Sequence, residues 1–137
     1  MIQFDKQAIV KKYLGIPYKH LGRGMDGLDC WGLIVRIYAD KGVEVFDLQE
    51  YEKEWARRGQ NIIVDNYYEN WQKVRSMELG DVMLLHYPRP ESPVSHAGLY
   101  LGNNRFIQAS FNGVIVSTME EWRSRVYGAF RYLNLKG

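Results

Sequence analysis

Apolar positions follow a helical spacing in the N-terminal part of the chain and gather into short runs in the C-terminal part. Phe4, Ala8, Ile9, Lys12 and Tyr13 fall on one helical face, and the segment Leu-Gly-Ile-Pro that follows is typical of a helix end. The spacing therefore predicts a first helix that ends just before this segment.

A second helix is predicted after a loop that covers residues 17–30 and is rich in glycine. Asp29 is a favourable N-cap residue, and a buried stripe follows it at helical spacing. Gly42 lies just beyond the Asp-Lys segment, where a glycine commonly ends a helix. The stripe consists of Leu33, Ile34, Ile37 and Tyr38.

From Gly80 onward the pattern changes to short apolar runs separated by turn residues, which predicts consecutive antiparallel strands. A short helix through Trp122 is also expected, because Ser117 and Thr118 each have a glutamate three residues later. For residues 43–75, which mix charge with aromatic side chains, one or two short helices are expected. Helices followed by strands indicate an α+β fold. The predicted strands cover residues 81–87, 95–102, 105–110, 113–118 and 127–133.

Length and charge limit the classes of function. At 137 residues, one domain spanning 1–137 is expected. The 18 Lys and Arg residues and 16 Asp and Glu residues are dispersed, so no nucleic-acid partner is expected. The apolar runs are too short for a membrane span, and the charged N-terminal segment lacks the apolar core of a signal peptide. We therefore expect a protein made in the cytoplasm without a signal peptide.

The single cysteine, Cys30, stands at the first position of the second predicted helix, directly after the Asp29 cap. Unpaired backbone N–H groups and the positive end of the helix dipole favour a thiolate at this position. The same N–H groups could hold the oxyanion of a tetrahedral intermediate. The alternative is that Cys30 is a small apolar side chain packed beneath the loop.

A thiolate nucleophile needs a base, and the base needs an orienting partner. His96 begins an apolar strand, and Gln108 is a polar residue in the next strand. If Gly102, Asn103 and Asn104 form a three-residue loop, His96 and Gln108 become diagonal neighbours with Cβ atoms about 7–8 Å apart. A loop with an even number of residues would place them on opposite faces. The alternative for Gln108 is a polar position on the solvent face of a hairpin.

The remaining polar residues give weaker signals. His20 and His86 are interpreted as surface or structural residues, and the histidine and cysteine positions match no zinc spacing, so neither a metal nor a cofactor is expected. The pair Asp26 and Asp29 is explained by a loop turn and a helix cap rather than by paired-carboxylate catalysis.

Four segments together resemble the NlpC family of papain-like cell-wall cysteine peptidases. They occur in the order that the family shows, between about Pro17 and Ser117, interrupted by residues 43–75. With a Trp in the segment Asp-Cys-Trp-Gly-Leu, the chain is most similar to the branch of the family encoded with bacteriophage tail genes. The segments read PYKHLGRGMDGLDCWGL, LGDVMLL, SHAGLYLGNNRFIQAS and GVIVS.

The resemblance implies a papain-like fold, with N-terminal helices packed on a C-terminal antiparallel sheet, and a set of roles. Cys30 would be the nucleophile, His96 the general base and acid, and Gln108 the residue that orients the imidazole. Tyr18 would lie over the nucleophile, and Asp29 would help to bind a free substrate amine. The implied substrate is a peptidoglycan stem peptide, cut between D-glutamate and a diamino acid. Other phage tail proteins are implied partners, and the virion tail an implied location.

Two positions depart from the family pattern. Trp31 stands where many cell-wall members have Ser, which predicts a more apolar substrate subsite at Trp31 and puts the free-amine specificity in doubt. Gln108 stands where His is frequent; an amide orients an imidazole without sharing charge with it. Two alternative functions stay open at this point: a phage tail assembly or structural protein whose site is idle or only processes other tail proteins, and a papain-like acyltransferase.

Overall fold

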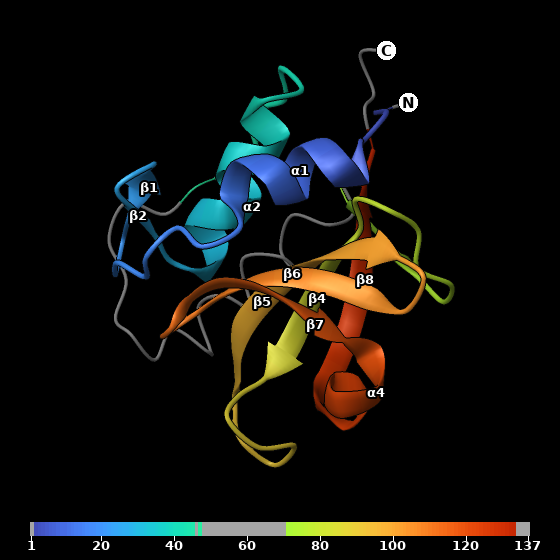
Figure 1. The fold of residues 1–137 in the computed structure, drawn as a ribbon. Helices are drawn as coiled ribbons and strands as arrows, with labels where there is room; N and C mark the ends of the chain where they lie inside the picture. The colour runs from blue at the N-terminus through green and yellow to red at the C-terminus, as the bar shows by residue number, and fades with distance from the viewer. Residues whose placement is uncertain (1, 46, 48–70, 134–137) are drawn as a thin grey trace.

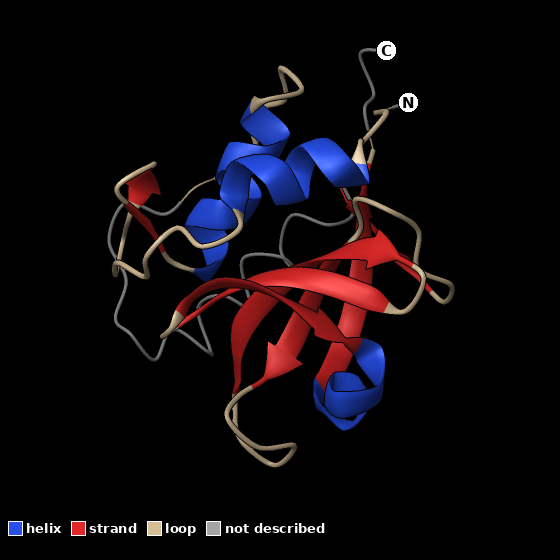
Figure 2. Ribbon diagram, viewed as in Figure 1, coloured by secondary structure: helices blue, strands red, loops and turns tan. Residues whose placement is uncertain are grey.

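The computed structural model describes residues 2–45, 47 and 71–133 of the chain. Two helices lie on one side of a curved antiparallel sheet, and a short helix lies on its other side (Figures 1 and 2). This arrangement is the α+β architecture that the order of the sequence signals predicts.

Each of the two N-terminal helices begins directly after an aspartate that caps it. Helix α1 spans Lys6–Tyr13, and Asp5 caps it by accepting a hydrogen bond from the backbone N–H of Ala8 at 3.2 Å. Helix α2 spans Cys30–Ala39 with Asp29 as its N-cap, and Gly42 adopts a φ of 73° shortly after its end. The predicted start of α2 and the predicted end of α1 before Leu14 are confirmed, because both signals depend on residues that are close in the chain.

Within the part of the chain that the structure describes, the main sheet has six strands in the order β3-β8-β4-β5-β6-β7. The strands are antiparallel to their neighbours, and all five predicted segments form strands. The expectation of simple consecutive pairing is correct only for β4 to β7, because β8 returns to lie between β3 and β4. The bounds are β3 Trp71–Val74, β4 Val82–His86, β5 Val94–Gly102, β6 Arg105–Ser110, β7 Gly113–Thr118 and β8 Val126–Tyr132.

Two further expectations need correction. Most of the segment 43–75, where short helices were expected, lies outside the described residues, but its end forms strand β3. Trp71 in β3 is 1% exposed and packs edge-on against Tyr132 of β8, so tertiary packing decides its conformation. The loop before Cys30 also contains a small hairpin, β1 Arg23–Gly24 and β2 Gly27–Leu28.

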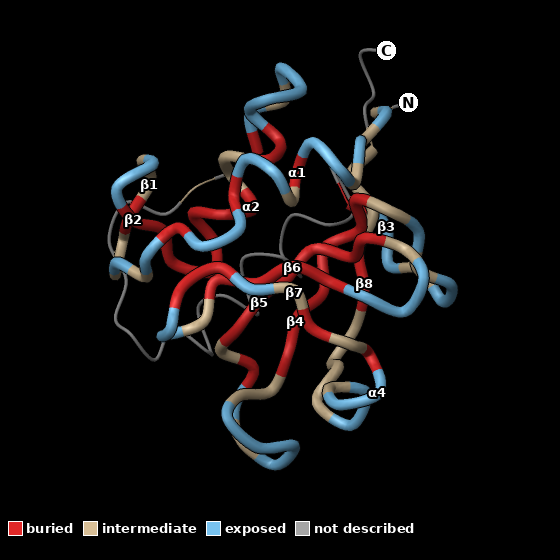
Figure 3. Tube along the Cα trace, viewed as in Figure 1, coloured by how far each residue is buried: buried red, intermediate tan, exposed pale blue. Residues whose placement is uncertain are grey.

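Side chains from the two faces of the sheet form two buried clusters. The larger cluster joins the helices α1 and α2 to one face, with Ile9, Ile34 and Leu99 among its members. The smaller cluster covers the other face and includes Phe106 and Met119, the first residue of helix α4 (Met119–Trp122). Figure 3 shows the buried backbone concentrated in the sheet and in the layer beneath the helices.

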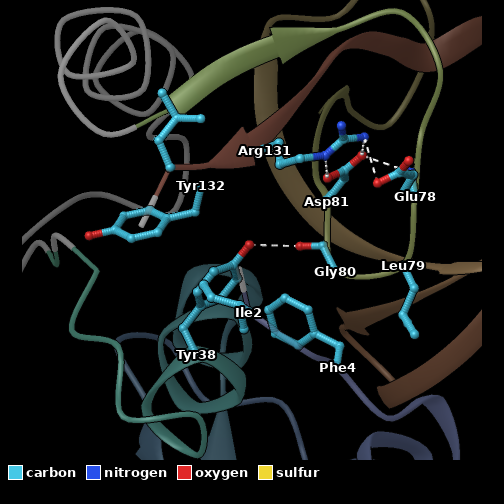
Figure 4. Close-up of a pocket in the computed structure, with 10 residues that line it drawn as sticks. Ile2, Phe4, Tyr38, Glu78, Leu79, Gly80, Asp81, Arg131 and Tyr132 are labelled. Carbon is cyan, nitrogen blue, oxygen red and sulfur yellow. Dashed lines mark hydrogen bonds and ion pairs between the residues drawn. The ribbon is translucent and has the colours of Figure 1, made fainter. Parts of the chain in front are cut away.

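The Gly80-Asp81 pair, part of one of the sequence segments singled out above, has a structural role in this fold. Asp81 is 2% exposed and forms hydrogen-bonded ion-pair contacts of 2.9 and 2.8 Å with Arg131 of β8, while the hydroxyl of Tyr38 donates to the carbonyl of Gly80 at 2.7 Å. These groups border an apolar pocket of about 220 Å³, which Phe4 also lines (Figure 4). The contacts connect α2 to the β4 and β8 strands.

Within the described residues, no helix has the length and apolar character needed to cross a bilayer.

The Asp81–Arg131 ion pair gives a stability prediction. Asp81→Asn removes the charge of a buried carboxylate that accepts two hydrogen bonds from Arg131, so we expect a loss of about 2–3 kcal/mol in the free energy of unfolding. Arg131 keeps its contacts with Glu78 and with the carbonyl of Ser76 in this variant. Urea denaturation measures this loss. The matched control is Asp26→Asn, which removes an exposed pair with Lys19 and should leave the stability unchanged. Equal stabilities of the two variants would contradict the prediction.

Candidate functional site

Cys30 is the first residue of α2, and its position is fixed by the cap of that helix. The carboxylate of Asp29 accepts a hydrogen bond from the backbone N–H of Gly32 at 2.8 Å. The Cys30 side chain is 5% exposed, so the residue lies at the edge of the core rather than on an open surface. The helix N-terminus therefore presents its positive end to this thiol.

Arg23, which the sequence analysis did not single out, holds the Asp29 carboxylate from the other side. Its Nη1 donates to Asp29 Oδ1 at 2.8 Å, and its Nε and Nη2 donate to Asp47. The backbone N–H of Leu21 donates to Asp29 Oδ2 at 2.9 Å. Asp29 is consequently only 2% exposed, and its carboxylate ties the glycine-rich loop to the start of α2.

The loop and the helix touch at two glycines. A Cβ atom on Gly32 would lie 2.1 Å from the carbonyl oxygen of Gly22, which is closer than any real contact. Glycine is required at position 32 because the backbone of the loop occupies the space of a side chain. The sequence signal that could have revealed this contact is the glycine directly after Cys30 and Trp31.

His96 and Gln108 meet across strands β5 and β6. Their side chains are joined by a hydrogen bond of 2.7 Å between His96 Nε2 and Gln108 Oε1. Leu99 pairs with Ile107, which is the register that the sequence argument required. The predicted proximity of these two residues is confirmed.

The turn that creates this register differs from the predicted three-residue loop. Gly102 pairs with Arg105, so the turn itself consists of Asn103 and Asn104, with φ values of 51° and 61°. The register shifts between Tyr100 and Gly102, and this bulge adds the extra residue that an odd offset needs. Asparagine tolerates positive φ, which explains why two consecutive asparagines occupy the turn.

Gln108 is completely buried and is held at both ends of its amide. Its Nε2 donates to Ser117 Oγ of β7 at 2.8 Å, while its Oε1 faces His96. An amide oxygen can only accept, so the Nε2 of His96 carries the proton in this bond. The other imidazole nitrogen, Nδ1, then has a lone pair that can accept a proton.

Aromatic rings enclose the His96 imidazole. Tyr87 lies 5.1 Å and Trp122 6.2 Å from it between ring centroids, and these two rings are parallel to each other at 6.0 Å. Burial lowers the pKa of His96 to about 4, although the hydrogen bond to Gln108 and the charge of Asp29 act in the opposite direction. The imidazole is therefore neutral at neutral pH.

Tyr18 lies in the same region as Cys30. The pKa of Tyr18 is raised to about 12, mainly by burial and further by its electrostatic interactions with Cys30, Asp29 and Tyr87. The ring of Phe111, in the turn after β6, packs edge-on against Tyr18 at 4.8 Å and is 63% exposed. Phe111 was not anticipated, because nothing in its local sequence distinguishes an exposed turn residue from one beside a site.

Three other expected residues lie elsewhere. Trp31 is 4% exposed and belongs to the core cluster, so its indole is part of the core. His86 Nδ1 is 2.8 Å from the carbonyl oxygen of Ser92, in agreement with a structural role. Asp26 is exposed and pairs with Lys19. Among the described residues, no group of three or more His, Cys, Asp or Glu side chains is arranged to hold a metal ion.

Helix α2, which begins with Cys30, packs against β5 and β6, the strands that carry His96 and Gln108 (Figure 1). Asp29 acts electrostatically on both His96 and Tyr18, and Cys30 acts on Tyr18, so these residues share one electrostatic environment. A thiol at a helix N-terminus, a neutral imidazole and an orienting amide are the groups that nucleophilic acyl transfer needs. We therefore regard this region as a candidate active site.

Comparisons with known proteins point to one family. The NlpC/P60 family model matches residues 15–131. The chain is 31% identical over 129 residues to the gamma-DL-glutamyl hydrolase of Bacillus subtilis, covering 91% of this chain and 28% of that protein. It is 31% identical over 140 residues to the murein DD-endopeptidase MepS/murein LD-carboxypeptidase of Escherichia coli, covering 94% of this chain and 64% of that protein. The chain thus spans less than two thirds of either relative.

Solved structures agree on the fold. An NlpC/P60 family protein from Bacillus cereus superimposes with a TM-score of 0.67 at 21% identity, over 96% of this chain and 42% of that one. The NlpC/p60 domain of the peptidoglycan hydrolase SagA gives a TM-score of 0.63 at 19% identity, over 92% of this chain and 95% of that one. These similarities confirm the predicted papain-like α+β fold.

The ring contacts of His96 generate a first prediction for the site. Trp122→Ala opens one side of the imidazole to water, so the pKa of His96 should rise from about 4 toward 6.5. NMR titration of the ring, assigned with a His96→Gln variant, measures the change. Trp122→Phe keeps an aromatic ring and should keep the pKa low. A pKa that stays near 4 in the alanine variant would show that this ring does not shield the imidazole.

The same pKa shift predicts how stability depends on pH. In the unfolded chain His96 binds a proton near pH 6.5, whereas in the folded protein it stays neutral down to about pH 4. The free energy of unfolding should therefore fall as the pH drops from 6.5 to 4, because the unfolded state binds more protons in this window. Urea denaturation of the wild type and of His96→Gln isolates this contribution, since other groups titrate in both. Identical pH dependences of the two proteins would contradict it.

Proposed function

Since this chain belongs to the NlpC/P60 family, we propose that it is a cysteine peptidase that hydrolyses an amide bond in peptidoglycan stem peptides. Cys30 is the nucleophile, His96 the general base and acid, and Gln108 the residue that orients the imidazole. The observation that carries the proposal is the buried His96–Gln108 hydrogen bond on β5 and β6, the strands against which the helix that begins with Cys30 packs.

The proposed reaction follows from the protonation state of the groups. Nδ1 of the neutral His96 takes the proton of the Cys30 thiol as the sulfur attacks the amide carbonyl carbon. Backbone N–H groups at the start of α2 stabilise the oxyanion that forms. His96 then gives the proton to the leaving amine, and the C–N bond breaks to leave a thioester. A water molecule hydrolyses the thioester, transferring a proton through His96, and the thiol is restored.

The substrate class is supported by the relatives, two of which are named as a gamma-DL-glutamyl hydrolase and a murein endopeptidase. We propose the bond between D-glutamate and the following diamino acid as the scissile bond. Tyr18, which interacts electrostatically with Cys30, and the exposed ring of Phe111 packed against it form the wall that contacts the peptide.

Three earlier expectations, on Asp29, on a phage tail and on Trp31, have different places in this proposal. Asp29 was expected to bind a substrate amine, but its carboxylate already holds Arg23 and the helix cap, so its part in the proposal is to position Cys30. Association with a phage tail is favoured by the Asp-Cys-Trp-Gly-Leu motif alone. Trp31 takes no part in the proposed substrate contacts because it is buried in the core.

Incubation with defined stem peptides, followed by mass spectrometry, tests the proposed activity. We expect the wild type, under reducing conditions at neutral pH, to release a fragment ending in D-glutamate. The reason is that the sulfur of Cys30 attacks the D-glutamate carbonyl of the scissile amide. Cys30→Ala removes the nucleophile and should abolish turnover, and His96→Ala should lower it by about 100-fold or more. Arg105→Ala, an exposed change at the far end of the β5–β6 hairpin, serves as the control and should keep full activity.

Several outcomes would decide against the proposal. A wild type that leaves every stem peptide intact would contradict hydrolysis. Transfer of the acyl group to an added amine or alcohol, without hydrolysis, would favour the acyltransferase alternative. Equal rates of Cys30 alkylation in the wild type and in His96→Ala would mean that the imidazole does not activate the thiol, as expected for an idle site.

A further inference from the structure

The segment that covers one side of His96 has little support of its own. Helix α4 has only four residues, Met119–Trp122, and its N-cap Thr118 forms no side-chain hydrogen bond with it. A 3₁₀ helix of three residues, Arg123–Arg125, follows directly and leads into β8. Helices this short are not stable by themselves, so contacts with other side chains must fix the position of Trp122.

The Trp122 indole has four neighbours among the described residues. Its ring centroid lies 6.2 Å from that of the His96 imidazole and 6.0 Å from that of Tyr87, which is parallel to it. Phe106 meets the indole edge-on at 5.8 Å. The guanidinium of Arg125 lies over the same indole, with its Cζ 4.7 Å from the ring centroid. Trp122 is only partly buried, so the ring is held at the surface by these contacts rather than enclosed in the core.

The other contacts of Arg125 are weaker than its contact with the indole. Its Nη1 donates to the carbonyl of Glu121 at 3.3 Å, and its Nε is buried without a hydrogen-bond partner among the described residues. A buried N–H group without an acceptor is costly, so another interaction must offset this cost. The attraction between a guanidinium and the face of an indole is such an interaction, and it strengthens where water is excluded.

We propose that Arg125 is a positioning residue, whose guanidinium holds the Trp122 indole beside the His96 imidazole and so keeps water away from it. This inference rests on the proposed function only for its catalytic consequence, since His96 is the proposed base. Two other titratable groups face His96 in the described part of the chain, Asp29 at the N-cap of α2 and Tyr87 directly after β4. The test leaves both of them in place.

NMR titration of the His96 ring in the wild type and in Arg125→Ala tests this role. Without the guanidinium the indole is held less firmly and water reaches the imidazole, so the pKa of His96 should rise from about 4 to about 5. Nuclear Overhauser contacts between the two rings should weaken in the same variant. On stem peptides, the acid limb of the pH profile of kcat should move to higher pH by the same amount, because a protonated imidazole cannot act as a base.

Two comparisons separate this role from a general effect of charge. Arg123→Ala removes an exposed arginine of the same 3₁₀ helix and should leave the pKa of His96 unchanged. Arg125→Ala in a Trp122→Ala background should cause no further rise, because the guanidinium acts through the indole.

An Arg125→Ala variant with an unchanged His96 pKa and unchanged ring contacts would overturn the proposal, as would an equal rise in Arg123→Ala. A further rise in the Trp122→Ala background would also overturn it, since the charge would then act directly on the imidazole. If Arg125→Ala does not fold, Arg125→Gln, which keeps most of the side chain without the charge, takes its place with the same expected rise. If the wild type cleaves no stem peptide, the proposed function fails while the NMR comparison still gives its answer.

Discussion

The register between β5 and β6 is the constraint on which the candidate site depends. Side chains alternate between the faces of a strand, so a slip of one residue would place His96 and Gln108 on opposite sides of the sheet. The bulge next to Gly102 and the two asparagines with positive φ fix the offset at the value that brings them together. A feature of the turn, at the far end of the hairpin from His96, thus decides whether the imidazole has an orienting partner.

Burial gives this hydrogen bond its significance. The rings of Tyr87 and Trp122 exclude water from His96, which keeps the imidazole neutral and lowers its pKa. In such surroundings a polar group without a partner is costly, so the amide of Gln108 must be satisfied at both ends. The aromatic rings and the hydrogen bonds from His96 through Gln108 to Ser117 therefore act together. The rings exclude water, and the hydrogen bonds replace those that water would have made.

The other half of the site is organised by a single carboxylate. Asp29 caps α2, accepts a hydrogen bond from the backbone N–H of Leu21 and pairs with Arg23, so its carboxylate connects the loop, the small hairpin and the helix start. A cation is already paired with this carboxylate in the protein itself. The immediate surroundings of Cys30 are consequently set by the chain's own charges as well as by the helix dipole.

The sequence by itself determined the features that depend on neighbouring residues. The end of α1, the N-cap of α2, the place of Cys30 at a helix start and the strand runs after Gly80 are encoded by short-range spacing. The odd offset of the β5–β6 hairpin was a condition that the sequence left open, and the bulge before Gly102 supplies it. Only the tertiary structure decided the insertion of β8 between β3 and β4, the burial of Trp31, the pairing of Arg23 with Asp29 and the contact of Ser117 with Gln108. These contacts join residues on different elements, or residues within a loop that has no periodic pattern. Which residues meet in these contacts depends on the pairing of the strands and on the packing of α2 against the sheet. A local sequence pattern does not contain this information.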